Sequence, residues 1–313
     1  MDTAFIFPGQ GSQSVGMGKS LADGSASARE VFEEVDDALG RRLSRLMFEG
    51  PAEELTLTEN AQPAIMAVGI AALRVLEKEG GLKLAEKARL VAGHSLGEYT
   101  ALAAAGALRI ADAARLLRLR GEAMQHAVPV GEGAMAAILG LDFAAVEAIA
   151  REASREGEVC AAANDNAPGQ VVISGDHAAV ERAIALARGR GARRAILLHV
   201  SAPFHCPLMA PAAEAMRGAL AQTPLAAPLV PVVANVTAAP AHDPDAIRAL
   251  LVEQVTHMVR WRESVAEMVR LGTGRFVEFG GRVLAPIVKR IAPDAEAFSI
   301  VEMKDVEAAL KAL

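Results

Sequence analysis

The sequence predicts an α/β fold in which a large domain, built on a mostly parallel sheet, carries a smaller inserted domain. Short apolar runs alternate with longer segments of helical pattern along almost the whole chain, as is typical of parallel sheets flanked by helices. The chain has 313 residues, of which 52% are apolar, so it can bury a substantial core without disulfides or a metal. It contains no repeat of about 20–50 residues, which argues against a solenoid.

Two strand signals open the predicted large domain. Residues 3–7 form an apolar run that stops at Pro8 and Gly9, which indicates a buried strand. Residues 88–92 form a second such run, and it leads directly into the glycine-bounded segment 93–97. Residues 98–107 then have helix-forming composition. The second unit therefore has the order strand, tight turn, helix.

Residues 128–199 differ from their surroundings and are predicted to form the small domain. The expected elements are strand 134–139, helix 143–154, strand 158–163, turn 164–169, strand 170–174, helix 178–188 and strand 194–200. This βαββαβ order is ferredoxin-like, and Asn166-Ala-Pro-Gly169 supplies suitable turn residues. The alternative is that these strands extend the main sheet. The preferred division leaves residues 1–127 and 200–313 for the large domain.

Composition and charge exclude several function classes. Aromatic residues make up only 4% of the chain and the net charge is -6, which argues against a nucleic-acid-binding surface. The two cysteines cannot form a disulfide framework, and no Cys/His cluster has the spacing of a zinc site. The N-terminus lacks a basic segment before an apolar run, and no apolar stretch is long enough to span a membrane. We therefore expect a cytoplasmic protein with no metal site.

Gly93-His94-Ser95-Leu96-Gly97 matches the pattern G-x-S-x-G, in which flanking glycines allow a sharp turn that lifts a strained serine out of the sheet. The preceding strand and following helix place Ser95 at a helix N-terminus, where free N–H groups favour developing negative charge. Ser95 is therefore a candidate nucleophile, and the large domain is hydrolase-like. Because the pattern is short, a plain glycine turn is the alternative.

A serine nucleophile needs a base, and His205 is the preferred candidate among seven histidines. It lies between Pro203 and Pro207, directly after the strand that closes the small domain, and the two prolines stiffen this loop. A structural loop histidine is the alternative. His94 should point away from the neighbouring Ser95. The remaining histidines lie in ordinary contexts; they are His126, His177, His199, His242 and His257.

Arg120 lies where a helix should be apolar. In a helix over residues 112–126, it falls in the middle of the face formed by Leu116, Leu117 and Met124. A buried arginine requires an anionic partner. That partner is either a protein carboxylate, or the carboxylate of a ligand held by two parallel hydrogen bonds.

Gln254 is a second polar side chain on an apolar helix face. A helix over residues 246–258 places it between Leu250 and Leu251, so its amide should be buried and hydrogen-bonded. An interruption of this helix near Gln254 would also free a backbone carbonyl that could orient a histidine. A satisfied core glutamine is the alternative.

Several separated motifs occur along essentially the whole chain. They are Phe7-Pro-Gly-Gln-Gly-Ser-Gln13, Gln62-Pro63, Gly93-His-Ser-Leu-Gly-Glu98, Arg120-Gly121, the segment 164–169 followed by Gln170-Val-Val-Ile173, Phe204-His205, and Gln254. In this order they resemble the malonyl-CoA:acyl-carrier-protein transacylases of fatty-acid synthesis. One departure is Glu278-Phe-Gly-Gly-Arg-Val-Leu284, which lacks the family's usual proline and is one residue shorter. The loop at Gly280-Gly281 should therefore differ in shape.

The resemblance implies a catalytic role for several residues. Ser95 would be the acylated nucleophile and His205 its base, with a backbone carbonyl near Gln254 holding the imidazole in place of an aspartate. The backbone N–H groups of Gln10 and Leu96 would form the oxyanion hole.

The resemblance also implies a substrate site. Arg120 would bind the free carboxylate of the malonyl group, and Phe204 would leave little room for a methyl branch. Asn164 and Asn166 would lie along the cleft.

The implied reaction is ping-pong transfer of malonyl from malonyl-CoA, through malonyl-serine, to the phosphopantetheine thiol of acyl carrier protein. Malonyl-CoA is a substrate in this reaction, and no permanently bound cofactor is expected. The partners would be the phosphopantetheinylated acyl carrier protein and coenzyme A thioesters, with no nucleic acid and no membrane, and the enzyme would be a monomer. A candidate basic patch for the acidic carrier consists of Arg188, Arg190, Arg193 and Arg194.

Two alternatives belong to other classes. A serine esterase or thioesterase of α/β-hydrolase type would need a catalytic Asp or Glu between Ser95 and the histidine in chain order, and no buried Arg120. A non-catalytic carrier-binding module would not need Ser95, His205 and Arg120 together. The sequence leaves the pathway of the carrier open among fatty-acid synthesis, polyketide synthesis and malonate decarboxylation.

Overall fold

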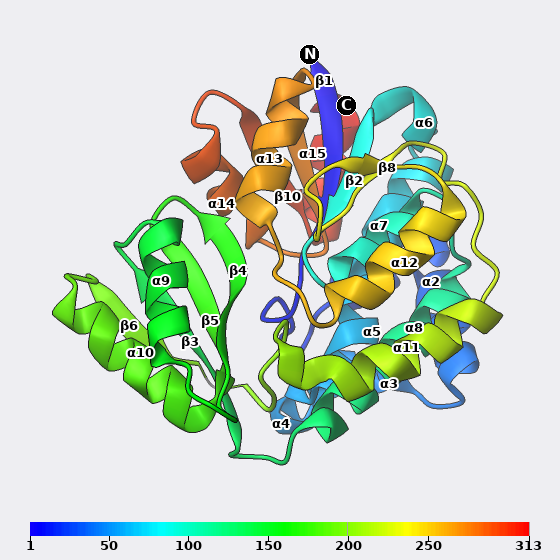
Figure 1. Ribbon diagram of the computed structural model, residues 1–313. Helices are drawn as coiled ribbons and strands as arrows, with labels where there is room; N and C mark the ends of the chain where they lie inside the picture. Colours follow the sequence, from blue (N-terminus) through cyan, green and yellow to red (C-terminus); the bar gives the residue numbers. More distant parts are fainter. Residues whose placement is uncertain (199, 313) are drawn as a thin grey trace.

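The computed structural model describes residues 1–198 and 200–312, and it contains two separate sheets (Figure 1). Sheet A has the strand order β10-β9-β1-β2-β7-β8. Its strands are β1 (Asp2–Phe7), β2 (Leu90–Gly93), β7 (Val232–Val233), β8 (Pro240–Ala241), β9 (Thr273–Phe279) and β10 (Glu296–Ile300). Neighbouring strands are parallel except for the antiparallel pair β7 and β8. The predicted α/β fold with a mostly parallel sheet is confirmed.

Helices cover both faces of sheet A because its central strand is apolar on both sides. Phe5 and Phe7 of β1 face one hydrophobic core, while Ala4 and Ile6 face the other. The second core is covered by α13 (Trp261–Arg270) and α14 (Leu284–Ile291). The first is covered by α1 (Lys19–Gly24), α2 (Ala26–Leu39), α3 (Leu43–Glu49), α4 (Ala52–Thr56), α5 (Thr58–Lys78), α6 (Leu84–Lys87), α7 (Gly97–Ala104), α8 (Ile110–Ala127), α11 (Ala210–Gln222), α12 (Pro244–Gln254) and α15 (Met303–Ala312).

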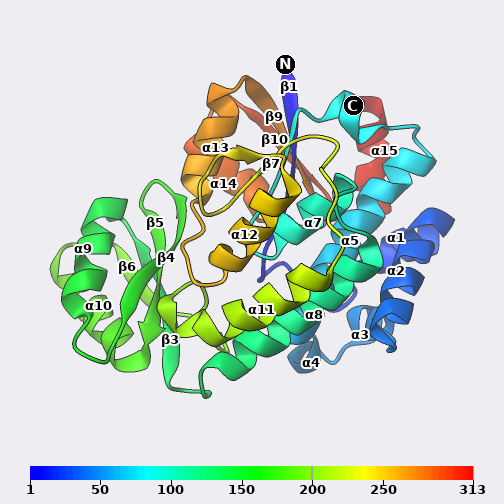
Figure 2. The ribbon, with the colours of Figure 1, turned by 45° about the vertical axis from the view of Figure 1, so that its right-hand side comes forward.

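Helices α8, α11 and α12 pack in succession on this face (Figure 2). A short 3₁₀ helix, η1 (Pro207–Met209), precedes α11. Within the described residues, no helix combines the length and apolar character needed to cross a membrane.

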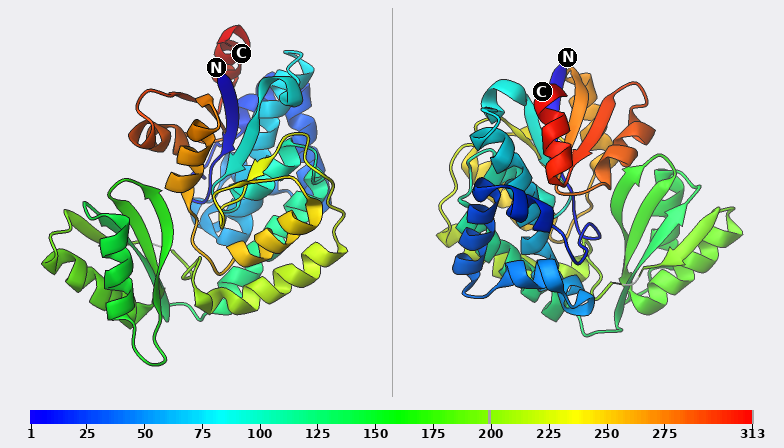
Figure 3. Two further views of the ribbon diagram at one scale, coloured as in Figure 1. Left: turned by 45° about the horizontal axis from the view of Figure 1, so that its top comes forward. Right: turned by 180° about the vertical axis from the view of Figure 1, so that it is seen from behind.

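Sheet B is antiparallel, has the order β4-β5-β3-β6, and lies to one side of sheet A (Figure 3). Its elements follow the predicted βαββαβ order; they are β3 (Gly133–Leu139), α9 (Phe143–Ala153), β4 (Cys160–Ala167), β5 (Gln170–Asp176), α10 (His177–Gly189) and β6 (Arg194–Leu197). Both helices pack on the sheet around a separate core that includes Ile138, Val146 and Val171. These strands do not extend sheet A. We propose that residues 128–199 form a domain inserted between residues 1–127 and 200–313.

The connection between the middle strands of sheet B is shorter than predicted. The prediction of a turn at 164–169 is wrong, because β4 continues to Ala167 and leaves only Pro168 and Gly169 between the strands. The extended strand pairs with the residues just before α13. The N–H of Asp165 donates to the carbonyl of Val259 (3.0 Å), and the N–H of Val259 donates to the carbonyl of Ala163 (2.9 Å). The buried Asp165 carboxylate also pairs with Arg262 of α13 (2.7 Å).

Three predicted elements end at least three residues earlier than expected. The helix after the G-x-S-x-G turn ends at Ala104, and the strand expected at 194–200 ends at Leu197. His199 lies outside the described residues. The helix expected at 246–258 ends at Gln254, so its last carbonyl groups are free to accept other donors.

The loop at Gly280-Gly281 is organised by a buried carboxylate. Glu278 is fully buried and accepts hydrogen bonds from the N–H groups at the start of α14, those of Val283, Leu284 and Ala285 (each 2.9 Å). Gly280 has φ 87°, and a Cβ there would lie 2.6 Å from the backbone nitrogen of Gly69. The loop can therefore close without a proline, with Glu278 capping the helix.

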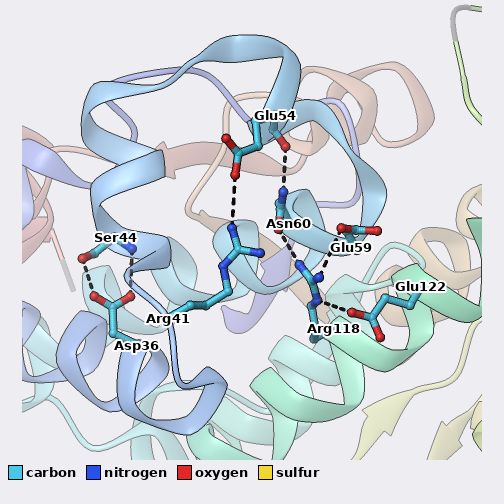
Figure 4. A network of polar contacts seen from close by, with 8 residues as sticks. All are labelled: Asp36, Arg41, Ser44, Glu54, Glu59, Asn60, Arg118 and Glu122. Atoms are coloured by element: carbon cyan, nitrogen blue, oxygen red, sulfur yellow. Dashed lines mark hydrogen bonds and ion pairs between the residues drawn. The ribbon is translucent and has the colours of Figure 1, made fainter.

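A polar network fixes α8 against the N-terminus of α5 (Figure 4). Arg118 donates to the side-chain oxygen of Asn60 (2.6 Å) and pairs with Glu59 (3.1 Å) and Glu122 (2.5 Å). Asn60 in turn donates to the carbonyl of Glu54 (2.8 Å). Three residues after Arg118, the backbones of the two helices touch at a glycine. A Cβ on Gly121 would lie 2.6 Å from the nitrogen of Glu59 and 2.7 Å from the carbonyl oxygen of Thr58.

Replacement of Gly121 by alanine should therefore destabilise the protein, because rigid backbone atoms block the added methyl group. We expect the free energy of unfolding to fall by about 1–3 kcal/mol in urea denaturation. Gly218 is the matched control, since it also lies inside a helix but has no atom within 4 Å of the position that a Cβ would take. Gly218→Ala should stabilise by about 0.4–1 kcal/mol. Equal effects of the two substitutions would contradict the close approach at Gly121.

Candidate active site

Ser95 lies in the tight turn between β2 and α7 and has a left-handed backbone conformation, with φ 54°. Glycine is required on both sides of it. A Cβ on Gly93 would collide with the carbonyl of Gly97, and a Cβ on Gly97 would collide with the carbonyl of Phe7. The two glycines therefore let the turn pass close to β1 and to itself, while the serine side chain faces a cavity.

His205 contacts Ser95 through one ring nitrogen and two backbone carbonyls through the other. Its Nε2 lies 2.7 Å from Ser95 Oγ, and its Nδ1 lies 2.9 Å from the carbonyl oxygen of Gln254 and 3.1 Å from that of His257. Because a carbonyl only accepts, Nδ1 must carry the ring proton. Nε2 is then free to accept the serine proton. The early end of α12 at Gln254 is what makes the first of these carbonyls available.

The surroundings of His205 keep its imidazole neutral. Burial is the main cause, and the positive charge of Arg120 adds to it; together they lower the pKa of His205 to about 3. The basic form is therefore present over the whole neutral and mildly acidic range.

Arg120 is buried in the core, as its position on α8 predicted, and its guanidinium reaches the nucleophile. It donates to the side-chain oxygens of Gln62 (2.8 Å) and Gln254 (2.9 Å), and to Ser95 Oγ (3.1 Å). All three partners are neutral. Burial lowers the pKa of Arg120, and its Nε has no hydrogen-bond partner among the described residues. Of the two partners considered for this cation, a protein carboxylate in direct contact is not found in the described chain.

Gln10 and Leu96 approach the same cavity from the ends of β1 and β2. Among the hydrogen bonds of the described residues, neither backbone N–H has an acceptor. The side chain of Gln10 is held in place, because its oxygen accepts from the Thr58 hydroxyl (2.8 Å), and that hydroxyl accepts from the amide of Gln62 (3.0 Å). The loop after β1 is thus tied to the residue that holds Arg120.

A cavity of about 380 Å³ lies between the two sheets and brings most of the candidate residues together. The candidates that line it are Gln10, Ser95, Leu96, Arg120, Asn164, Asn166, Phe204 and His205. Gln254 does not line it and lies behind Arg120. The side-chain oxygen of Asn166 lies 2.8 Å from His94 Nε2, so part of its amide is already engaged. No group of three His, Cys, Asp or Glu side chains in the described chain is arranged to hold a metal ion.

Sequence reasoning did not single out Glu98 or Asn235, which belong to the hydrogen-bond network that holds the turn around Ser95. Glu98 is buried, and burial raises its pKa to about 7. It accepts from the side chain of Gln254 (2.8 Å) and from the backbone N–H of Asn235 (3.0 Å). A charged residue in the first buried turn of α7 was a usable signal for Glu98. Asn235 follows a short apolar run and carried no such signal.

Comparison with known proteins identifies the family. A family model described as acyl transferase domain matches residues 4–281. A malonyl CoA-acyl carrier protein transacylase from Bacillus subtilis (strain 168) is 45% identical over 311 residues, which cover 99% of this chain and 96% of that protein. The chain belongs to the malonyl-CoA:acyl-carrier-protein transacylase family. The resemblance inferred from the separated motifs is thereby confirmed.

Two solved structures of this family extend the comparison. An acyl-carrier-protein-S-malonyltransferase from Bartonella henselae is 53% identical, with a TM-score of 0.97 over 100% of this chain and 99% of the other. A malonyl-transacylase in complex with its type II PKS acyl-carrier protein is 41% identical, with a TM-score of 0.96 over 100% of both chains. The family fold is therefore present along the entire chain.

The contacts of His205 differ from those of an α/β-hydrolase. That alternative requires an acidic side chain on the histidine, whereas Nδ1 of His205 faces the carbonyls of Gln254 and His257. It also gives no reason for the buried Arg120 beside Ser95.

The lowered pKa of His205 predicts an unusually wide acidic working range. A base whose folded pKa lies below its ordinary value stays neutral as the pH falls, so acylation of Ser95 should not weaken between about pH 8 and pH 5.5 through this residue. The measurement is kcat/KM for CoA release from an acyl-CoA substrate across this range. Glu98→Gln is the control, because it removes the nearby carboxyl that titrates near pH 7. An acid limb near pH 6.5 that persists in Glu98→Gln would contradict the prediction.

Proposed function

We propose that this protein transfers the malonyl group of malonyl-CoA to the phosphopantetheine thiol of acyl carrier protein, for fatty-acid synthesis. The observation that carries the proposal is the guanidinium of Arg120, which is buried, donates to the neutral side chains of Gln62 and Gln254, and lies 3.1 Å from the hydroxyl of Ser95. A cation in this position suits an acyl group whose far end is a carboxylate. The names of relatives at 45% and 53% identity support the same reaction.

In the first half-reaction Ser95 Oγ attacks the thioester carbon of malonyl-CoA, while His205 Nε2 accepts the serine proton. The N–H groups of Gln10 and Leu96 stabilise the oxyanion of the tetrahedral intermediate. The C–S bond then breaks, and the departing CoA sulfur takes the proton from His205. Malonyl-serine and free CoA are the products of this half-reaction.

In the second half-reaction the thiol of the carrier's phosphopantetheine attacks malonyl-serine. His205 takes the thiol proton, and the sulfur forms the new thioester bond as the ester bond to Ser95 breaks. The proton returns from His205 to Ser95 Oγ, which restores the free enzyme. Because the carbonyls of Gln254 and His257 hold the imidazole throughout, no carboxylate is needed on the histidine.

Selectivity follows from the groups around the Arg120 guanidinium. Hydrogen bonds to Gln62 and Gln254 hold the Arg120 guanidinium beside Ser95, where it can pair with the malonyl carboxylate. An acetyl group would leave the buried cation without an anion. Phe204, on the cavity wall, would restrict a methyl branch, and Asn164 and Asn166 would contact the rest of the acyl thioester.

The remaining properties are part of the same proposal. The protein acts in the cytoplasm as a monomer, binds no nucleic acid and needs no permanently bound cofactor. The relative solved with a type II PKS acyl-carrier protein makes a polyketide carrier the second candidate for the acceptor. The suggested basic patch is partly engaged within the protein, since Arg188 donates to the carbonyl of Ala195 and Arg190 pairs with Glu152. Arg193 and Arg194 remain exposed.

Ser95→Ala should abolish formation of the malonyl-enzyme, because no other hydroxyl lies at Nε2 of His205 among the described residues. Intact-mass spectrometry after mixing with malonyl-CoA measures the adduct directly. The wild-type protein without carrier is the control, and it should hold its malonyl group without rapid continued CoA release. Persistence of the adduct in Ser95→Ala would place the nucleophile elsewhere, and rapid CoA release by the wild type without acceptor would favour a hydrolase.

Arg120→Ala should lower kcat/KM for malonyl-CoA by roughly a hundredfold, equivalent to about 3 kcal/mol, because the substrate carboxylate loses its cation in a buried site. Transfer of an acetyl group should improve relative to malonyl transfer, since the unpaired cation is gone. The ratio of the two rates is the measurement, and it is insensitive to partial misfolding. Equal losses for both acyl groups would show that Arg120 is structural.

A further inference from the structure

The left-handed backbone of Ser95 has to be held by its surroundings, because a non-glycine residue rarely adopts φ near 54°. A small rotation of this turn would move Oγ away from His205 and Arg120. The protein can therefore fix the direction of the Ser95 hydroxyl through hydrogen bonds to the N–H and C=O groups of the turn.

One buried amide bridges the turn on both sides of His94. The Oδ1 of Asn235 accepts a hydrogen bond from the N–H of Ser95 (2.7 Å), and its Nδ2 donates to the carbonyl of Gly93 (2.7 Å). Asn235 is completely buried. The amide makes both contacts because it carries an acceptor and a donor on one planar group.

Asn235 is itself held rigidly. Its N–H donates to the Glu98 carboxylate (3.0 Å), and its carbonyl accepts from the N–H of Arg260 (3.0 Å). It comes two residues after β7, which pairs with β2 directly before the turn. The amide is thus presented to the turn from the neighbouring strand of the same sheet.

These contacts also determine which backbone N–H groups of the turn remain free to bind the oxyanion. The N–H of Ser95 is used by Asn235, and its carbonyl accepts from the side chain of Gln254 (3.0 Å). The N–H of Leu96 has no acceptor among the described residues, and Leu96 lines the cavity.

We propose that Asn235 is a positioning residue for the transfer reaction, which aims Ser95 Oγ at His205 and the N–H of Leu96 at the thioester oxygen. The proposal rests on the proposed function, in which Ser95 is the acylated residue. It requires the amide specifically, with its acceptor on Ser95 and its donor on Gly93. A residue that only filled space at position 235 would not restore the reaction.

Asn235→Asp tests this requirement because the substitution keeps the shape and changes one group. The ionised carboxylate has no donor for Gly93, and it would lie near the Glu98 carboxyl, since Gln254 Nε2 contacts both Glu98 Oε2 (2.8 Å) and Asn235 Oδ1 (3.4 Å). Once protonated, the introduced carboxyl group would again carry one donor and one acceptor. The other charged or titratable groups nearby are Arg120 behind Gln254, His205 and His94 around Ser95, and Arg260 on the following segment.

The measurement is single-turnover formation of malonyl-serine, followed by CoA release and normalised to folded protein. At about pH 8 we expect the acylation rate of Asn235→Asp to fall roughly a hundredfold, as for a misplaced reacting group, with little change in KM for malonyl-CoA. The ratio of the variant's rate to that of the wild type should then rise as the pH is lowered to about 5.5. Asn235→Ala should be slow at every pH.

Asn60→Asp is the matched control. Asn60 is also a buried amide that donates to a carbonyl and accepts from a neighbour, but it does not touch the turn. Its rate relative to the wild type should not depend on pH. A pH-independent ratio for Asn235→Asp, an unchanged rate, or an effect on KM alone would overturn the positioning role.

A second readout separates this proposal from the proposed function. If the wild-type protein forms no malonyl-serine, the proposed function fails, and a fluorophosphonate that phosphonylates activated serines becomes the probe. The rate of its reaction at Ser95, measured by mass spectrometry, depends on the aim of the hydroxyl and not on the acyl group. The same order of rates among wild type, Asn235→Asp and Asn235→Ala would support the positioning role, and equal rates would overturn it.

Discussion

The burial of a single cation, Arg120, constrains how the other parts of the site are arranged. A guanidinium removed from water needs hydrogen-bond acceptors in several directions, and here they come from α5, α12 and the turn after β2. Helix α8 must therefore lie close to α5, which is possible because Gly121 has no side chain. Among the described residues the direct partners include no carboxylate, and the buried Glu98 is linked to Arg120 through Gln254. The packing that builds the core therefore places a cation beside the nucleophile, with no carboxylate in direct contact among the described residues.

Gln254 connects this cation to the catalytic pair. Its side-chain oxygen accepts from Arg120, its amide nitrogen donates to Ser95 and Glu98, and its backbone carbonyl accepts from His205. One residue at the end of α12 therefore contacts the cation, the nucleophile and the base at once. This is why the end of the helix matters as much as the identity of the side chain, since a continued helix would have used the carbonyl for its own hydrogen bonds.

Those features that follow from local pattern could be predicted from the sequence. The burial of Arg120 and Gln254 follows from helical periodicity, and the strained turn follows from the glycines around Ser95. Features that depend on contacts between distant segments could not be predicted in this way. The extension of β4 depends on pairing with the distant Val259, and Asn235 follows an apolar run that gives no sign of its contact with Gly93 and Ser95. The partner of His205 was anticipated only as a carbonyl near Gln254, and the second carbonyl, from His257, was not.

Residues 254–262, from the end of α12 to the start of α13, contact both the catalytic base and sheet B. The first residues of this segment hold the imidazole of His205, and Val259 and Arg262, a few residues further on, bind β4 of the neighbouring sheet. Sheet B therefore has a core of its own and is also attached to the segment that orients the base. In a chimera that takes residues 128–199 from a homologue, the two backbone hydrogen bonds can form again, but the ion pair needs an acidic residue at position 165 opposite Arg262.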